Sequence, residues 1–280
     1  MRICETVATM RAECAALRYG GRRLGLVPTM GALHEGHLSL LRAARAQCDV
    51  VAASIFVNPT QFGPQEDLAK YPHPFARDSE LLRAEGVDLL FAPSVDEMYP
   101  AGGVTYVNVE RLSERLCGRS RPGHFRGVAT VVSKLFHVVQ PEAAFFGQKD
   151  AAQVAVIRAM VRDLLLPVEI VACPIVRETD GLALSSRNVY LTAEQRRHAL
   201  TIYRSLSRVR ELYEGGERDT ASLIGAGVEE FSRDDEVRLD FLEIVDAKSL
   251  EPLETAQPGA LVALAGFVGS TRLIDNIVLG

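Results

Sequence analysis

The sequence predicts an α/β protein: a mostly parallel sheet covered by helices on both faces, followed by a smaller α+β unit. Three observations lead to this prediction. Short apolar runs alternate with helical patterns over the first two-thirds of the 280 residues. The helical stretches between these runs are ~10–15 residues long, enough for the crossovers that parallel strands require. After about residue 176 the pattern changes to a helix followed by antiparallel strands.

The first part of the chain contains candidate strands and candidate helices in alternation. The apolar runs that predict strands are residues 23–28, 50–57, 87–92, 104–109, 143–147 and 168–173. The periodic stretches that predict helices are residues 7–17, 36–47, 77–85, 128–139 and 150–165. Strands joined by helices of this length form β-α-β units, which predicts a parallel sheet with both faces buried.

The last third of the chain has a different pattern. Apolar residues recur at helical spacing over residues 199–213, which predicts one amphipathic helix. Residues 237–241 alternate between apolar and charged side chains, as in a half-buried strand. Residues 260–266 and 273–279 flank a Gly-Ser-Thr turn and predict a hairpin.

This change of pattern predicts a domain boundary near residue 176. We expect a first domain over residues 1–175 and a second over residues 176–280. The join between them, residues 175–191, is rich in polar side chains. Ligand sites are common between two such bodies.

Composition excludes several classes of protein. Lysine and arginine total 31 and aspartate and glutamate 36, a formal net charge of −5, and an acidic chain without a basic stripe argues against a nucleic-acid partner. Five cysteines, never spaced Cys-x-x-Cys, argue against a disulfide framework or a zinc knuckle and favour a reducing compartment. No run of ~18 apolar residues predicts a membrane span, and the charged first twenty residues do not resemble a signal peptide. We therefore expect a soluble, cytoplasmic protein.

The segment Leu26–Leu41 combines a strand end, two glycines and two histidines. The strand ends near Pro28, and a helix begins near His37, three residues after His34. Free backbone N–H groups and the helix dipole at such a start favour a bound phosphate. Both histidines can face that phosphate and donate hydrogen bonds to phosphoryl oxygens, where negative charge grows during displacement.

Two other motifs can be compared with the residue types and spacing of this segment. Zinc proteases need two histidines four residues apart, but the residue four beyond His34 is Leu38. The P-loop needs Gly-Lys-Ser/Thr, and the segment contains no lysine. The structural alternative is that the histidines only cap the helix, and their position directly after the first strand favours a ligand site over that alternative.

A second polar cluster, Asn58 and Gln61, directly follows the next predicted strand. Ligands of open α/β sheets bind at the carboxyl ends of strands, where these amides can orient the hydroxyl or carboxylate groups of a small substrate. An Asn-Pro turn is the structural alternative. Asp78 is a candidate Mg²⁺ contact, with an N-capping or surface role as an equal alternative.

The segment Phe145–Gln153 repeats the layout of strand, turn and helix start. Lys149, with Asp150 beside it, offers a positive charge for a nucleotide phosphate. Gln153 lies four residues beyond Lys149, so both side chains can project from one helical face. A solvated lysine is the structural alternative.

The polar join contains Ser185, Ser186 and Arg187, whose hydroxyl and guanidinium donors suit phosphoryl oxygens. Because the join connects two domains, it can close over a bound nucleotide. A serine-rich turn with a surface arginine is the alternative. Arg121 and His124 lie in a glycine-rich loop, where their spacing alone assigns no role.

Taken together, these segments closely resemble the pantothenate synthetase (pantoate–β-alanine ligase) family. The match runs in order over residues ~20–195. The matching segments are Pro-Thr-Met-Gly-Ala-Leu-His-Glu-Gly-His from Pro28, Phe-Val-Asn-Pro-Thr-Gln-Phe from Phe56, Arg-Pro-Gly-His-Phe-Arg-Gly-Val from Arg121, Phe-Phe-Gly-Gln-Lys-Asp from Phe145 and Leu-Ser-Ser-Arg-Asn from Leu184. His-x-Gly-His alone marks only the broader nucleotidylyltransferase superfamily, whereas five motifs in register are specific.

The resemblance implies a Rossmann-like N-terminal domain, a smaller C-terminal domain that closes over it, and a homodimer. It implies that ATP, pantoate and β-alanine react to AMP, pyrophosphate and pantothenate through an enzyme-bound pantoyl adenylate, with Mg²⁺. The ATP site implied by position consists of Met30, Gly31, His34, His37, Gly147, Gln148, Lys149, Asp150, Val176, Leu184, Ser185, Ser186 and Arg187.

The resemblance also implies the substrate contacts and the reacting groups. Pantoate contacts fall on Gln61 and Gln153, with Gln61 also near β-alanine, and the usual catalytic assignment falls on His37. The other residues of the predicted site are His34, Lys149 and Arg187 as catalytic groups, Asn58 and Arg121 as substrate contacts, and Asp78 as the metal contact.

One position departs from the family pattern. The family usually has Tyr-Pro-Arg-Thr where this chain has Tyr71-Pro72-His73-Pro74. Replacing an always-charged arginine by a histidine removes any ion pair or loop anchor made there, while the catalytic motifs are complete.

The chemistry of these residues agrees with the implied reaction. An acyl adenylate forms when a carboxylate attacks the α-phosphate and pyrophosphate leaves. The carboxylate is already ionised near neutral pH, so the site has to neutralise phosphate charge and position the groups. In the second half-reaction the ammonium of β-alanine has to lose a proton, and either His37 or water takes it.

Two other functions are to be distinguished from this one. Nucleotidyl transfer to a phosphorylated substrate needs an additional cationic cluster, but Asn58, Gln61 and Gln153 are neutral. A catalytically silent nucleotide-binding or regulatory protein does not need both histidines together with Lys149 and Arg187. Release of pyrophosphate with pantoate but without an amine separates the three functions.

Overall fold

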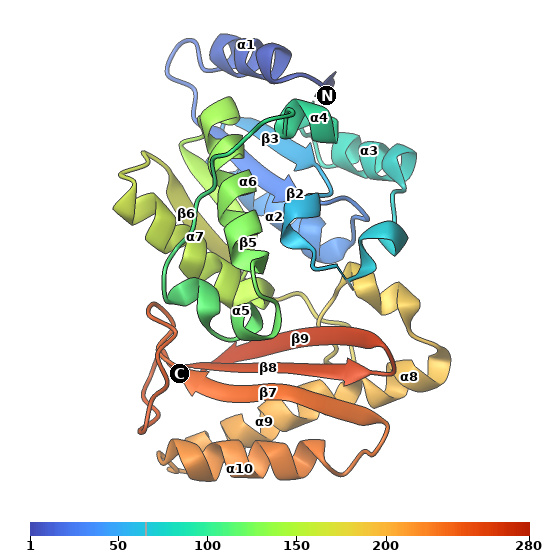
Figure 1. Ribbon diagram of the computed structural model, residues 1–280, viewed down its shortest axis with the longest axis vertical. Helices are drawn as coiled ribbons and strands as arrows, with labels where there is room; N and C mark the ends of the chain where they lie inside the picture. Colours follow the sequence, from blue (N-terminus) through green and yellow to red (C-terminus); the bar gives the residue numbers. More distant parts are fainter. Residues whose placement is uncertain (65) are drawn as a thin grey trace.

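The larger of two sheets in the computed structural model, which describes residues 1–64 and 66–280, has six parallel strands in the order β1-β4-β3-β2-β5-β6 (Figure 1). Every neighbouring pair in this sheet is parallel, as the alternation of strands and helices predicts. Its strands are β1 (Arg2–Cys4), β2 (Leu24–Thr29), β3 (Val50–Ile55), β4 (Leu89–Phe91), β5 (Ala143–Gly147) and β6 (Glu169–Cys173).

Helices cover both faces of this sheet because the central strands are apolar on both sides. On β2, Leu24 and Leu26 pack into one hydrophobic core and Val27 into another. Helices α1 (Val7–Leu17), α6 (His124–Val139) and α7 (Ala151–Asp163) contribute to the first core, whereas α2 (Glu35–Gln47) and α3 (Phe75–Ala84) contribute to the second. The short helices α4 (Val95–Met98) and α5 (Cys117–Ser120) lie in the connections.

The order of the strands places a crevice at the carboxyl end of β2. From β2 the chain proceeds to β3 and β4 on one side, and it later adds β5 and β6 on the other side. Ligands of open α/β sheets bind where the strand order reverses in this way. The segment after β2 and the segment after β5 therefore meet at this point.

The second sheet is antiparallel and has helices on one face. Its strands are β7 (Val237–Val245), β8 (Leu261–Val268) and β9 (Thr271–Val278), preceded by helices α8 (Ala193–His198), α9 (Leu200–Glu214) and α10 (Thr220–Phe231). On β8, Val262 and Leu264 pack into a core shared with α9 and α10, whereas Ala263 and Ala265 belong to the core of the larger sheet. The smaller sheet therefore packs its second face against the first part of the chain, below it in Figure 1.

The predicted strand at residues 104–109 is wrong. These residues are irregular, and no strand among residues 1–64 and 66–280 pairs with them. Strand patterning alone did not decide this segment, because a strand also needs a neighbour that satisfies its backbone groups. Among the described residues, the strand β1 and the helices α4, α5, α8 and α10 are not predicted from the sequence; β1 has only three residues, too few to show a period.

The other predicted elements are present within a few residues, including the helix over 199–213 and the hairpin β8–β9. A domain boundary near residue 176 stays a prediction: the first sheet ends at Cys173 and the second begins at Val237. All five cysteines are buried free thiols. Within the described ranges, no helix has both the length and the apolar character needed to cross a lipid bilayer.

Candidate active site

A cavity of ≈ 220 Å³ lies at the crevice between the ends of β2 and β5. Most of the predicted site residues line it. They are Met30, His34, His37, Asn58, Gln61, Arg121, Gly147, Lys149, Asp150, Gln153, Val176, Leu184, Ser185, Ser186 and Arg187. Gly31, Gln148 and Asp78 are not part of its lining. The fold thus brings separate motifs of the sequence to one cavity.

His34 and His37 form the entrance to helix α2. His34 is the N-cap residue, and its Nδ1 accepts a hydrogen bond from the backbone N–H of Gly36 at 3.1 Å. The Nδ1 of His37 accepts from the backbone N–H of His34 at 3.3 Å. The two rings lie 4.1 Å apart, centroid to centroid. The histidines therefore cap the helix and also line the cavity, and their contact with a phosphate stays a prediction.

These hydrogen bonds determine where the ring protons are. Because each Nδ1 accepts from a backbone N–H, the proton of each neutral ring lies on Nε2. Burial lowers the pKa of His34 to about 4, with the charge of Lys149 adding to the effect. Burial, and then the neighbouring His34, lowers the pKa of His37 to about 3. Both rings are therefore neutral N–H donors at physiological pH.

The lowered histidine pKa values predict a loss of stability in mild acid. In the unfolded chain these histidines titrate near a pKa of about 6.5, whereas in the folded protein the pKa of His34 is about 4, that of His37 about 3 and that of His124 about 4. The unfolded state binds more protons in this window, so stability rises with pH. We expect the free energy of unfolding to be highest above about pH 7 and to fall as the pH drops below about 6.5.

Urea unfolding at about pH 7.5, 6.5 and 5.5 measures this dependence, because most Asp and Glu side chains titrate below these pH values. His124→Gln should reduce the slope of stability against pH, and His137→Gln, which changes an exposed ring, is the control for the loss of an imidazole. A stability that stays constant over this pH range would contradict the assignment of neutral buried rings.

Asp78 anchors the turn that leads into α2. It is 1% exposed, and its carboxylate oxygens accept from the backbone N–H groups of Ala32 at 2.7 Å and Leu33 at 2.9 Å. Gly31 has φ +84°, and an added Cβ would lie 3.1 Å from the Asp78 carboxylate, so this position requires glycine. Both oxygens accept from the backbone and the side chain lies outside the cavity lining, so the structure shows Asp78 as a turn anchor, and the metal contact stays a prediction.

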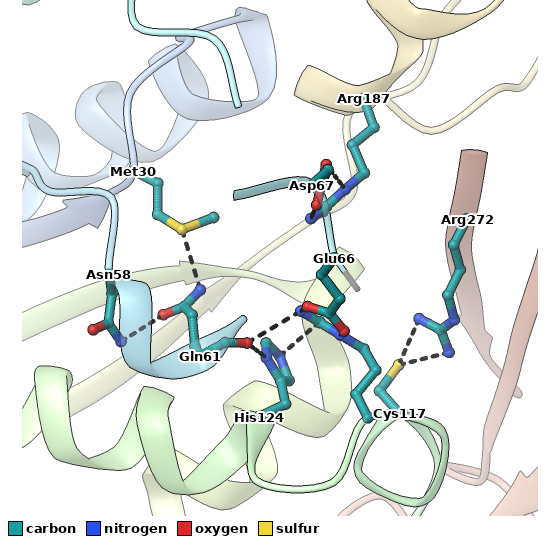
Figure 2. Close-up of polar contacts among 10 residues, drawn as sticks. Met30, Asn58, Gln61, Glu66, Asp67, Cys117, His124, Arg187 and Arg272 are labelled. Atoms are coloured by element: carbon teal, nitrogen blue, oxygen red, sulfur yellow. Dashed lines mark hydrogen bonds and ion pairs between the residues drawn. The ribbon is translucent and has the colours of Figure 1, made fainter. Parts of the chain in front are cut away.

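Asn58 positions Gln61. Asn58 is 1% exposed, and its amide nitrogen donates to Gln61 Oε1 at 3.0 Å (Figure 2). The same nitrogen donates to the carbonyl oxygen of Gly127 at 3.1 Å. Its Oδ1 accepts from the Tyr99 hydroxyl at 2.8 Å. Both of its amide hydrogens are used within the protein, so the structure shows Asn58 positioning Gln61, and a direct substrate contact of Asn58 stays a prediction.

Gln61 keeps one amide hydrogen available to the cavity. Its Nε2 lies 3.1 Å from the sulfur of Met30, a weak acceptor that uses only one of the two hydrogens (Figure 2). Gly127 allows helix α6 to approach this residue, because an added Cβ would lie 2.3 Å from the carbonyl oxygen of Thr60. The amide of Gln61 is thus held at the cavity by α6.

Arg121 and His124 form a network below Gln61. Arg121 forms a bidentate ion pair with Glu66 at 2.7 and 2.6 Å. His124 Nδ1 donates to the carbonyl oxygen of Gln61 at 2.9 Å, since a carbonyl only accepts, and His124 Nε2 accepts from Arg121 at 3.0 Å. Burial, and then Arg121, lowers the pKa of His124 to about 4, in agreement with a neutral ring.

Two further cations face the cavity in different environments. Arg187 forms a bidentate ion pair with Asp67, with both distances 3.0 Å (Figure 2). The ammonium of Lys149, on the 3₁₀ helix Gln148–Asp150, lies 3.9 Å from the Asp150 carboxylate, the one ion pair recorded for it among the described residues. Lys149 is therefore the less neutralised of the two cations.

The polar join forms a small hairpin at the edge of the cavity. The backbone N–H of Leu184 donates to the carbonyl oxygen of Val176 at 3.0 Å. Ser185 caps the following 3₁₀ helix Ser186–Tyr190, and the hydroxyl of Ser186 lies 3.1 Å from that of Tyr71. The hydroxyl groups and the Arg187 guanidinium are thus presented on one turn.

The departure from the family pattern lies outside the cavity. His73 is exposed, and its ring centroid lies 6.3 Å from that of Tyr71. It does not line the cavity, whereas Tyr71 does. The replacement of the family's usual arginine therefore leaves the groups around the cavity in place.

The sequence pattern assigns no role to several residues around this site. Among them are Glu66, Asp67 and Tyr71, which contact the predicted residues Arg121, Arg187 and Ser186, and His124, which contacts Gln61. Glu66 and Asp67 follow Gln61 closely in the segment between β3 and α3, and this position is the sequence signal that could have identified them. Nothing in the local pattern indicates which arginines these carboxylates meet.

Comparison with known proteins gives the same family over the whole chain. The family model described as "Pantoate-beta-alanine ligase" matches residues 2–278. The pantothenate synthetase of Moorella thermoacetica is 59% identical over 279 residues, covering 100% of this chain and 99% of that protein. That of Acidobacterium capsulatum is 56% identical over 291 residues, covering 100% of this chain and 97% of that protein.

Solved structures agree with these matches. The crystal structure of pantothenate synthetase from Thermus thermophilus superposes with a TM-score of 0.94 at 50% identity, covering 99% of both chains. A pantoate–β-alanine ligase from Francisella tularensis, complexed with β-γ ATP and β-alanine, superposes with a TM-score of 0.83 at 33% identity, covering 99% of this chain and 97% of that one. With the same fold, the full motif set and matches end to end, the chain belongs to the pantoate–β-alanine ligase family.

Proposed function

We propose that this cavity binds ATP and pantoate side by side and activates pantoate as its adenylate. Members of this family condense pantoate with β-alanine to form pantothenate, with AMP and pyrophosphate as the other products, and this chain is such a ligase. One observation carries the residue assignments. Neutral N–H donors from α2, the ammonium of Lys149 and the donors of Ser185–Arg187 surround one cavity that also contains Gln61 and Gln153.

The first half-reaction needs charge stabilisation more than a base. The pantoate carboxylate is ionised at neutral pH and attacks the α-phosphate, and the bond to the departing pyrophosphate breaks. The Nε2–H groups of His34 and His37 donate to phosphoryl oxygens, and Lys149 neutralises the charge that grows as pyrophosphate leaves. Arg187 exchanges Asp67 for the phosphates when ATP binds.

Pantoate fits the part of the cavity that is apolar on one side and polar on the other. Val128 and Val131 of helix α6 form an apolar wall suited to the two methyl groups of pantoate. Gln61 and Gln153, in the same lining, offer amides to its hydroxyl and carboxylate groups. This arrangement orients the carboxylate toward the phosphates.

The second half-reaction needs removal of a proton from the ammonium of β-alanine. The pKa of His37 is lowered to about 3 and its Nε2 already carries a proton, so His37 is a donor and a weak base. We therefore assign this proton to water. The amine then attacks the acyl carbon, and AMP leaves with the bonding electrons.

Mg²⁺ accompanies ATP in this proposal. Within the described residues, no group of three metal-ligating side chains is present, and Mg²⁺ at nucleotides is held largely by phosphate oxygens and water with one or two carboxylates. Asp150 supplies such a carboxylate in the cavity lining, next to Lys149. When bound, Mg²⁺ neutralises triphosphate charge.

We also propose that the second domain, residues 176–280, closes over the nucleotide and that the protein is a homodimer. Residues 104–109 have the pattern of a strand without a strand partner among the described residues, and Val104 is 85% exposed. A segment with this pattern can pair with the same segment of a second copy, as exposed edge strands do. Light scattering should give twice the chain mass of 30.6 kDa, and Val104→Lys should lower it; a monomeric parent would contradict the dimer.

A cytoplasmic location is the remaining part of the proposal. All five thiols are free, and free thiols are typical of reducing compartments. Cell fractionation with antibodies against the chain tests this location, and recovery outside the cytoplasm would contradict it.

The function is tested by separating its half-reactions. Pyrophosphate release from ATP should require pantoate, and release of pantothenate should further require β-alanine. Pyrophosphate release with a phosphorylated acceptor in place of pantoate would support the other nucleotidyl transfer; against it, Gln61 and Gln153 in the lining are neutral. Nucleotide binding without turnover would support a silent binding protein.

Gln153→Ala should weaken pantoate binding far more than ATP binding. Its amide is expected to orient pantoate, and its loss leaves the phosphate donors in place. Isothermal titration with each ligand measures the two affinities, with Gln47→Ala, an exposed residue of α2, as the matched control. An equal loss for both ligands would indicate general disruption of the cavity instead.

A further inference from the structure

Two neighbouring residues of strand β9, Asp275 and Asn276, are polar and almost completely buried. They are 3% and 2% exposed. Leu273 and Ile277 of the same strand belong to the hydrophobic core under α9 and α10. Buried polar side chains of this kind are costly unless their hydrogen-bonding groups are satisfied, and the partners of both residues are informative.

Asn276 holds the turn that carries Lys149. Its amide nitrogen donates to the carbonyl oxygens of Gln148 and Lys149, both at 2.9 Å. Its Oδ1 accepts from the side chain of Gln148 at 3.3 Å. Because carbonyl oxygens only accept, the amide orientation is determined by these two partners. Both hydrogens of one side chain therefore fix two consecutive peptide groups of the 3₁₀ helix Gln148–Asp150.

Asp275 holds the hairpin that leads to Ser185–Arg187. Its carboxylate forms a bidentate ion pair with Arg177 at 2.5 and 2.9 Å. Arg177 also donates to the carbonyl oxygens of Gly181 at 3.0 Å and Asn276 at 3.2 Å. The backbone of Arg177 pairs with that of Ala183, two residues before Ser185. The position of this hairpin thus depends on the Asp275 carboxylate.

We propose that Asp275 and Asn276 form a positioning dyad for adenylation. One residue holds the segment that bears Lys149, and its neighbour holds the segment that bears Ser185–Arg187, so a single strand of the second sheet sets the distance between the two groups of phosphate donors. The dyad does not touch the substrates. This inference rests on the proposed role of Lys149 and Arg187 in the first half-reaction.

Asn276→Ala should slow adenylation by ~10–10²-fold, the loss expected when a reacting group is misplaced by about 1 Å. The kcat of adenylation should decrease and the KM for ATP should increase, whereas the KM for pantoate should stay unchanged. Amide formation from preformed pantoyl adenylate and β-alanine should stay within about twofold of the parent, because pyrophosphate has already left. Asn276→Ser takes its place in every measurement if the alanine variant does not fold.

Ile277→Val is the matched control. It removes one buried methylene from the next residue of β9, which lowers the stability of the same strand without touching Gln148 or Lys149. Both half-reactions of this variant should match the parent at a temperature where the protein is folded. Equal slowing of both half-reactions by Asn276→Ala, as general loosening would give, overturns the proposal.

A double-mutant cycle shows whether Asn276 acts through Lys149. If it does, Lys149→Met with Asn276→Ala should adenylate at the rate of Lys149→Met alone, because the group to be positioned is already absent. Asp275→Asn should be coupled in the same way to Arg187→Met. If the two substitutions of each cycle act independently, the factors by which they slow adenylation multiply in the double variant. This result in both cycles would overturn the dyad.

The same data separate failure of the dyad from failure of the proposed function. If Lys149→Met slows adenylation and Asn276→Ala does not, only the dyad is wrong. If Lys149→Met adenylates like the parent, the proposed role of Lys149 is wrong and the dyad falls with it.

Discussion

His37→Ala is expected to lower the rate of adenylate formation by ~10²–10³-fold, as for the loss of one transition-state hydrogen-bond donor. The ring is neutral, its Nδ1 accepts from the backbone of His34, and its Nε2–H remains for the phosphates. Pantoate-dependent pyrophosphate release in single-turnover experiments measures this step. A rate within a few-fold of the parent would show that His37 only caps α2.

A second substitution separates capping from catalysis. His37 occupies the third position of α2 and completes a capping box with His34, a position at which glutamine makes the same hydrogen bond. His37→Ala should lower the free energy of unfolding by about 1 kcal/mol through the lost cap. His37→Gln should restore this stability but not the rate of adenylation. His137→Ala, on the exposed side of α6, is the control for the loss of any imidazole.

Lys149→Met is expected to slow adenylation by a comparable factor. The loss of a desolvated charge contact should raise the activation free energy by on the order of a few kcal/mol. Methionine keeps most of the volume of the side chain and removes the ammonium. The recorded carboxylate neighbour, Asp150, lies at 3.9 Å, so the charge of Lys149 is directed to the phosphates more than to a protein partner. Thermal stability should hardly change.

The second half-reaction provides the internal control for Lys149→Met. Pyrophosphate has left before the amine attacks, so amide formation from preformed pantoyl adenylate should be much less affected. Lys248→Met, an exposed lysine in a turn, should leave both steps unchanged. If amide formation is impaired as strongly as adenylation, Lys149 does not act on the departing phosphates.

The segments around His37 and Lys149 show how far a sequence can be interpreted on its own. In each, an apolar strand, a glycine-containing turn and a helix start follow one another within a short stretch of chain. These are local signals, because strand pattern, turn and cap depend on neighbours in the chain. The site residues in these motifs were accordingly predicted, and most of them line the cavity.

For Asp78 and Asn58 the sequence leaves two roles open. Asp78 is interpreted as a Mg²⁺ contact or a capping residue, and Asn58 as a substrate contact or part of an Asn-Pro turn. The structure engages Asp78 with backbone groups 46 and 45 positions away, and Asn58 with Gly127, 69 positions away. The sequence does not indicate whether a polar side chain will bond to a ligand or to a distant peptide group.

The sequence by itself determined the parallel α/β architecture, the hairpin at the end of the chain and the motifs whose polar residues meet at the cavity, because periodicity and motifs are properties of neighbouring residues. Tertiary structure alone decided that residues 104–109 are not a strand, that Glu66 and Asp67 face Arg121 and Arg187, and that Asn276 reaches Gln148 across 128 positions. The physical reason is that these contacts form only when separate elements pack. Their partners are selected by the geometry of the packed core and leave no period along the chain.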